Sequence, residues 1–224
     1  MFSVVFEVKP HTTKLDEYLA NAKLLRPELE RIDGFVDNIR YKSLTRDGWI
    51  LSLSNWRDEK ALVRWRTTAK HHEIQKLGRG EIFEDYHLRV GQLTADTRLP
   101  AGCELREQRL DLTEVGEGSV ITLIDAKRPP EFKETGNPAD CSEYLGLDPY
   151  AADMVSWDIF EAVLTPDDLI LLISWKDESA ALSYEDLMVE APKDARTRRI
   201  RIIRDYGMFD RREAPQYYPS VEAT

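Results

Sequence analysis

The chain has 224 residues, of which 42% are hydrophobic and 32% are charged, and these values are typical of a soluble globular protein. Its formal net charge of −10 disfavours nucleic-acid binding, because binding to the phosphate backbone needs a basic face. No apolar run approaches the ~20 residues that a membrane-spanning helix needs, and residues 1–6 lack the basic region of a signal peptide. We therefore expect no nucleic-acid partner, no membrane partner and a cytoplasmic location.

The first half of the chain predicts strands and helices in the order β-α-β-β-α-β. Alternating, β-branched and aromatic residues predict strands at residues 2–8, 35–43, 49–54 and 82–93. Helical spacing and acidic or hydroxyl helix starts predict helices at residues 14–31, 58–68 and 71–77. This order is typical of the ferredoxin-like unit, a four-stranded antiparallel sheet with two helices on one face.

Part of the sequence occurs twice. Residues 54–62 (SNWRDEKAL) return as residues 173–181 (ISWKDESAA), at an offset of 119 residues. A period this long predicts two duplicated domains, because solenoid repeats are far shorter. The predicted strands of the second half are residues 119–124, 154–165, 168–174 and 198–211, and its predicted helices are residues 138–147 and 179–188.

We therefore predict an α+β protein built from two ferredoxin-like domains. Residues 1–93 form the first domain, residues 118–211 form a diverged second domain, residues 94–117 connect them and residues 212–224 form a tail. A single ferredoxin-like sheet leaves one apolar face bare, and a second copy in the same chain covers it. The expected architecture is an intrachain dimeric α/β-barrel, a pseudo-dimer with its sheets packed together. Further homodimer formation and a connector strand at residues 104–112 are additional expectations.

One constellation in the first half carries a family resemblance. Residues 55–59 (NWRDE) are followed by Trp65, by His72 and by residues 84–86 (EDY). This pattern resembles the antibiotic biosynthesis monooxygenase (ABM) family over about residues 1–93. The second half keeps only the matching tryptophan, the acidic helix start and a late Asp-Tyr pair. The resemblance implies a monooxygenase that acts without metal or flavin on a small aromatic partner, such as a quinol or a polyketide.

His72 is the predicted catalytic base. It stands seven residues after Trp65, so both side chains can face one side of a continuous helix, and His71 would then point elsewhere. The predicted substrate-binding residues are Asn55, Trp56, Trp65 and Tyr86. Each has a structural alternative, because an asparagine can cap a helix and an aromatic ring can pack in a core.

The second repeat lacks the histidine, since Glu190 and Ala191 stand at the aligned position. We therefore expect a single site, in the first half. Two other functions stay open, namely a non-catalytic ligand-binding or scaffold protein of the same fold and haem binding through His72. The haem-degrading relatives use an asparagine in the first strand, which residues 2–8 lack. No phosphate loop and no metal-ligand spacing occurs in the sequence, so the expected cofactor is none.

Overall fold

The computed structural model describes residues 1–132, 137–187, 192–219 and 221. The strands are β1 (Phe2–Pro10), β2 (Phe35–Ser43), β3 (Ile50–Trp56), β4 (Phe83–Asp96), β5 (Val120–Lys127), β6 (Met154–Ala162), β7 (Asp168–Trp175) and β8 (Arg196–Gly207). The α-helices are α1 (Leu15–Leu29), α2 (Glu59–Arg66), α3 (Ala69–Leu77), α4 (Pro138–Tyr144) and α5 (Glu178–Leu187). The predicted α+β class is confirmed, and so is the β-α-β-β-α-β order of the first half.

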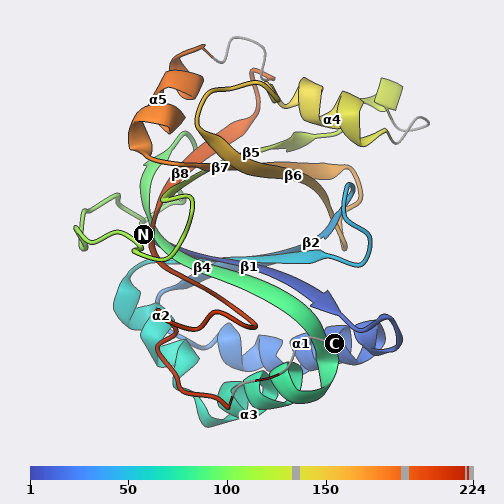
Figure 1. Cartoon of the computed structure of the whole chain (residues 1–224), viewed down its shortest axis with the longest axis vertical. Coiled ribbons are helices and arrows are strands. Elements are labelled where there is room, and N and C mark those ends of the chain that lie inside the picture. Colours follow the sequence, from blue (N-terminus) through green and yellow to red (C-terminus); the bar gives the residue numbers. More distant parts are fainter. Residues whose placement is uncertain (133–136, 188–191, 220, 222–224) are drawn as a thin grey trace.

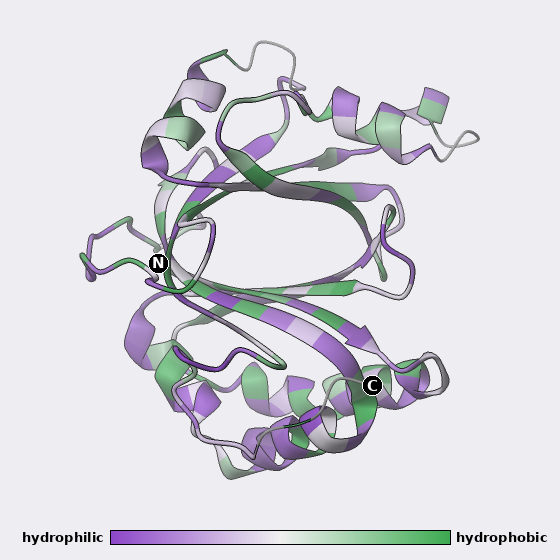
Figure 2. Cartoon of the chain, in the orientation of Figure 1, coloured by the Kyte–Doolittle hydropathy of each residue, from purple (hydrophilic) through white to green (hydrophobic). Residues whose placement is uncertain are grey.

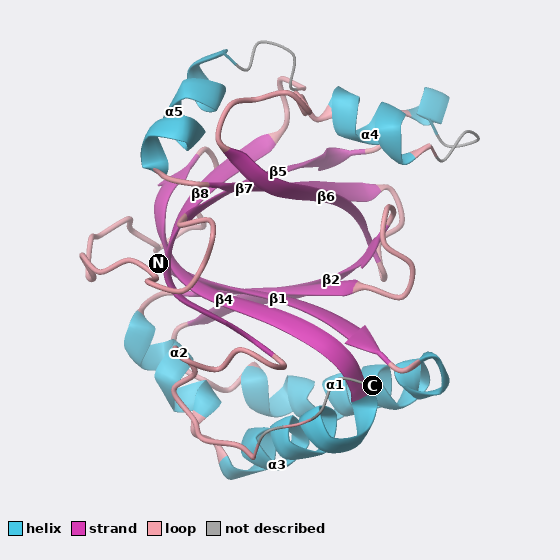
Figure 3. Ribbon diagram, viewed as in Figure 1, coloured by secondary structure: helices cyan, strands magenta, loops and turns pink. Residues whose placement is uncertain are grey.

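The strands of the described chain close into one antiparallel barrel in the order β1-β3-β2-β6-β7-β5-β8-β4. Two seams join the halves of the chain, because β4 pairs with β8 and β2 pairs with β6. Helices α1–α3 cover the outside of the first half, and α4 and α5 cover the outside of the second (Figures 1 and 3). Closure thus pairs both outer edges of each four-stranded half, which an open sheet would leave exposed.

Side-chain alternation along the strands separates the barrel interior from the helical layers. Val5 of β1 packs inside the barrel, whereas its neighbours Val4 and Phe6 face the helices of the first half. The interior is filled by Met1, Val5, Tyr41, Leu51, Leu53, Leu93, Ile121, Leu123, Phe160, Ala162, Ile170, Leu172, Ile200 and Ile202. Figure 2 shows apolar residues alternating with polar ones along the strands. Both halves therefore share one apolar core.

A network of buried charges also links the two halves. Glu7 of β1 accepts from Arg89 of β4 and from Arg46, which lies in the β2–β3 turn. Arg46 also contacts Asp158 of β6 at 2.6 Å, so the network reaches the second half. Burial by itself would raise the pKa of Glu7, but the two guanidinium groups outweigh it and hold that pKa below its usual value.

The connector between β4 and β5 departs from the prediction. Residues 104–112 form no strand, and the expectation of one is wrong. Two backbone N–H groups of this segment, those of Gln108 and Arg109, donate to the side-chain oxygen of Gln92 instead of to a strand. The predicted end of the last helix at residue 188 lies outside the described residues, and the domain boundaries stay a prediction. None of the described helices combines the length and apolar character that crossing a bilayer requires.

Gly91 allows the close approach of β4 and β8. A Cβ atom there would lie 2.6 Å from the carbonyl oxygen of Arg201 and would collide with Ile200. Gly91→Ala is expected to lower the free energy of unfolding by about 1–3 kcal/mol in urea titrations. The reason is that the backbone of Arg201 cannot move aside as the flexible end of a side chain can. Gly80→Ala is the control, since its Cβ would have no neighbour within 4 Å. Equal stabilities for the two variants would contradict the assigned seam.

Candidate functional site

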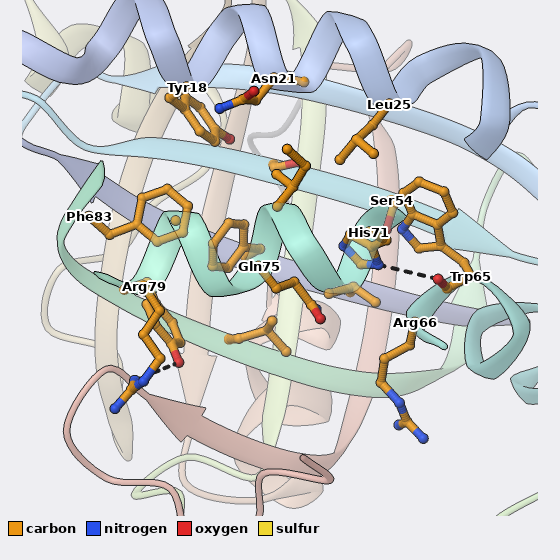
Figure 4. A pocket seen from close by; sticks show the side chains of 18 of the residues that line it. Tyr18, Asn21, Leu25, Ser54, Trp65, Arg66, His71, Gln75, Arg79 and Phe83 are labelled. Carbon is orange, nitrogen blue, oxygen red and sulfur yellow. Dashed lines mark hydrogen bonds between the residues drawn. The ribbon is translucent and has the colours of Figure 1, made fainter. Parts of the chain in front are cut away.

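A cavity of about 210 Å³ lies between the first-half sheet and helices α1–α3. One face of α1 forms its roof through Tyr18, Asn21, Ala22, Leu25 and Leu29, whose spacing of three or four residues puts them on one side of a helix. In Figure 4, Trp65 and His71 lie at one end of this cavity, and Arg79 and Phe83 lie at the other.

Two small residues of β3 leave room for the cavity. Ser52 and Ser54 face the helical layer and line the cavity floor. The repeat offset aligns them with Leu171 and Ile173 of β7, which are fully buried against α4 and α5 in the second half. The two serines are much smaller than the leucine and isoleucine at the corresponding positions. The space under the helices is therefore open in the first half and filled by side chains in the second. This difference is visible in the sequence repeat, where serines at residues 52 and 54 correspond to Leu171 and Ile173.

His71 lines the cavity and stacks on Trp65. The ring centroids are 4.4 Å apart with an interplanar angle of 16°, and His71 Nδ1 donates to the Trp65 carbonyl oxygen at 3.3 Å. The assignment of His72 used the register of one continuous helix from Trp65, although separate helices were predicted at residues 58–68 and 71–77. Instead α2 ends at Arg66 and α3 begins at Ala69, and this break changes which histidine faces inward.

The surroundings of His71 keep its imidazole neutral. Burial is the main cause, and it lowers the pKa of His71 from 6.5 to about 4. With Nδ1–H engaged by the carbonyl of Trp65, the neutral ring has its lone pair on Nε2. His71 can thus accept a proton or a hydrogen bond within the cavity at neutral pH.

His72 lies outside the cavity. Its side chain is exposed, its ring stacks with Tyr218 at 5.6 Å, and its Nδ1 is 3.1 Å from the Tyr218 hydroxyl. Tyr218 belongs to the C-terminal segment, residues 208–219, which runs from β8 back towards α3 (Figure 1, red). His72 therefore contacts the C-terminal segment, and His71 is the neighbouring histidine that lines the cavity.

The remaining predicted site residues divide into two groups. Trp65 and Tyr86 line the cavity. Asn55 instead accepts from Ser3 Oγ and donates to Asp37, both at 2.6 Å, so its amide is engaged between strands. Trp56 is fully buried and packs edge-on against a phenylalanine of β2. Neither Asn55 nor Trp56 is among the described residues that line the cavity. Trp56 follows its core-packing alternative, whereas Asn55 does not cap a helix, because Asp58 caps α2.

The cavity is positively charged. Among the described residues, its lining includes Arg40, Arg66, Arg79 and Arg211 and no aspartate or glutamate. The Nε atoms of Arg40 and Arg66 are buried and make no hydrogen bond within the described chain. Sequence analysis did not single out these arginines, because they come from β2, α2, the turn after α3 and the C-terminal segment, and no local motif unites them.

Other polar atoms in the cavity also lack partners. The Tyr18 hydroxyl and Asn21 Nδ2 are buried, and no group in the described residues hydrogen-bonds to either. Buried polar groups are normally satisfied, so such atoms in a cavity wall are suited to binding a polar ligand atom. Within the part of the chain that the structure describes, no three His, Cys, Asp or Glu side chains are grouped as metal ligands.

Comparisons with known proteins agree with this fold. The antibiotic biosynthesis monooxygenase family profile matches residues 1–77. A jasmonate monooxygenase, ABM, of Pyricularia oryzae is 49% identical over 225 residues, which cover 98% of this chain and 99% of that protein. The crystal structure of an aldoxime dehydratase covers 90% of this chain and 80% of its own at a TM-score of 0.56, and its 10% identity shows likeness of fold alone. The predicted family is confirmed, and the chain belongs to the antibiotic biosynthesis monooxygenase family.

Proposed function

We propose that this protein is a monooxygenase that oxidises a small, largely apolar carboxylate of the jasmonate class in the first-half cavity. The observation that carries the proposal is an apolar cavity with four arginines and no acidic residue among its described lining, in a chain of net charge −10. Such a site favours an anion with a hydrocarbon body. The 49% identical relative, which is named for jasmonate, supports the same class of substrate.

Arg66 is the proposed partner of the substrate carboxylate. Arg79 and Arg211 already donate through their Nη atoms to the Tyr86 hydroxyl and to backbone carbonyls, whereas Arg79 Nε, like Arg66 Nε, is buried without a partner in the described chain. Arg66 Nε is buried without a partner in the described chain, and Arg66 lies at the end of the cavity that holds Trp65 and His71, with its guanidinium directed away from the His71 ring in Figure 4. Arg40, in β2, adds positive charge from the floor and packs against the ring of Tyr18.

His71 is the proposed base. Its neutral imidazole faces the cavity, and its stacking on Trp65 fixes the ring plane. General-base catalysis needs an unprotonated acceptor within hydrogen-bond reach of the substrate. Burial keeps His71 unprotonated but also weakens it as a base, so its position in the cavity is what supports the proposal. Trp65 and Tyr86 are proposed to contact the substrate, as sequence analysis expected.

A small aromatic substrate is the second candidate, because Phe6, Phe83 and Tyr86 form an edge-on aromatic cluster in the wall opposite Trp65. The two candidates differ in their electron balance. Monooxygenation puts one atom of O2 into the substrate and sends the other to water, which takes two electrons and two protons. A deprotonated quinol supplies these electrons itself and needs no cofactor, whereas a jasmonate needs an external two-electron donor.

Purified protein is expected to consume O2 with jasmonate when a reductant such as NADH or ascorbate is present. Arg66→Gln should weaken jasmonate binding by about 10- to 100-fold and leave binding of methyl jasmonate unchanged, because only the acid carries the charge. Calorimetric titration and oxygen electrode traces measure both effects. Arg64→Gln is the control, because Arg64 lies on the same helix and its guanidinium contacts Asp33 outside the cavity.

The assays also separate the alternatives. O2 uptake with hydroquinones and without a reductant, and none with jasmonate, would establish the aromatic candidate instead. Binding of jasmonate without O2 uptake under any condition would establish a ligand-binding protein. A wild-type protein that binds the acid no better than the ester would overturn the carboxylate assignment.

The two histidines should differ in catalysis. With the substrate that is turned over, His71→Gln is expected to lower kcat by about 100-fold or more, because a general base commonly contributes that much. His72→Gln should keep kcat within a few fold, since His72 contacts only the C-terminal segment. Equal losses in both variants would contradict the assignment of the base.

The pKa of His71 predicts a pH dependence of stability. Its folded value of about 4 lies below the ordinary 6.5, so between these values the unfolded chain binds more protons than the folded one. The free energy of unfolding should therefore fall as pH drops from about 6.5 to about 4, by on the order of 3 kcal/mol from this group. Urea titrations of His71→Gln should show a shallower slope over this window, and those of His72→Gln should match the wild type.

A further inference from the structure

The Tyr86 hydroxyl stands between two guanidinium groups at one end of the cavity. Arg79 Nη1 donates to it at 3.1 Å, and Arg211 Nη1 donates to it at 2.5 Å. The Arg79 bond is drawn in Figure 4. Tyr86 is only 8% exposed and lines the cavity, so this hydroxyl belongs to the cavity wall.

Both guanidinium groups are fixed by the C-terminal segment. Arg79 also donates to the carbonyl oxygens of Met208 at 2.6 Å and of Pro219 at 3.3 Å. Arg211 donates to the carbonyl oxygen of Gln216 at 2.9 Å, and its guanidinium lies over the rings of two tyrosines of the second half, at 5.3 and 5.6 Å. The two donors to Tyr86 are thus held in place by contacts of their own.

This arrangement determines the direction in which Tyr86 can donate. A phenol oxygen has a limited capacity to accept, and two arginine N–H groups occupy it here. The phenol keeps its own hydrogen, and in the described residues no group accepts that hydrogen from Tyr86. Donation from two cations also polarises the O–H bond and strengthens it as a donor. The remaining direction for the hydrogen is the cavity.

We infer that the Tyr86 hydroxyl donates a hydrogen bond to a carbonyl oxygen of the molecule in the cavity, and that Arg79 and Arg211 are its positioning residues. For a jasmonate the acceptor is the ring ketone. The inference rests on the proposed function only in taking this cavity as the substrate site. It also gives the second half of the chain a part in the site, because Arg211 follows β8 and reaches across to β4.

Two neutral probes test the inference without relying on the carboxylate. They are 2-pentylcyclopentanone and its isostere in which a methylene group, =CH2, replaces the ketone oxygen, and both are titrated by tryptophan fluorescence or calorimetry. The wild-type protein should bind the ketone about 3- to 10-fold more tightly, which is the usual worth of one neutral hydrogen bond. Tyr86→Phe should abolish this preference, and Arg211→Met should reduce it.

Tyr184→Phe is the matched control. Tyr184 is a buried tyrosine of α5 whose hydroxyl donates to the carbonyl oxygen of Gly146, so its loss affects stability and not the cavity. This variant should keep the full ketone preference. If the role of Tyr86 were purely structural, Tyr86→Phe would lower the affinity for both probes equally, and that result would overturn the inference.

The outcomes separate this inference from the proposed function. A ketone preference that Tyr86→Phe abolishes, in a protein that does not oxidise jasmonate, would support the inference and refute the proposed substrate. Oxidation of jasmonate together with a preference that survives in Tyr86→Phe would refute the inference alone. A wild-type protein that binds neither probe, or binds both equally, also refutes it.

Discussion

The pairing of β4 with β8 is the contact on which the rest of the structure depends. It closes the barrel and joins the apolar interiors of both halves into one core. Its register also sets Gly207 opposite His87, so the chain leaves β8 beside the first-half cavity. The C-terminal segment can therefore cover the cavity and bring Arg211 to the Tyr86 hydroxyl. A site in the first half thus takes part of its wall from the last residues of the second.

The two halves share a pattern of strands and differ in what the outer sheet face carries. In the second half Leu171 and Ile173 fill the space under the helices, and that face serves only as a core. In the first half Ser52 and Ser54 free this space, and arginines from four separate segments surround it. The two halves thus differ in having a filled core or a cavity at this face, because the side chains at corresponding positions of β3 and β7 differ in volume.

The short break between α2 and α3 has a large effect on the chemistry of the site. Thr67 and Thr68 donate their hydroxyls back to carbonyls of α2, which ends that helix, and α3 then starts in a new phase. The result is that His71, and not His72, stacks on Trp65 inside the cavity. Burial keeps the His71 imidazole neutral, while the arginines in the cavity lining carry positive charge.

Hydrophobic periodicity and the internal repeat were enough to predict most strands and helices, and the motif of residues 55–59, Trp65, His72 and residues 84–86 was enough to predict the family. Trp65 and Tyr86, which were predicted to bind substrate, line the first-half cavity. These features are local or recur at a fixed offset, so they can be recognised along the chain. The inward-facing histidine was decided by a helix break of two residues, which shifts every later side chain around the helix axis. The arginines of the cavity lining and the contacts of Tyr86 with Arg79 and Arg211 were decided only by tertiary structure. Barrel closure brings together these residues, which are spread from β2 to the C-terminal segment.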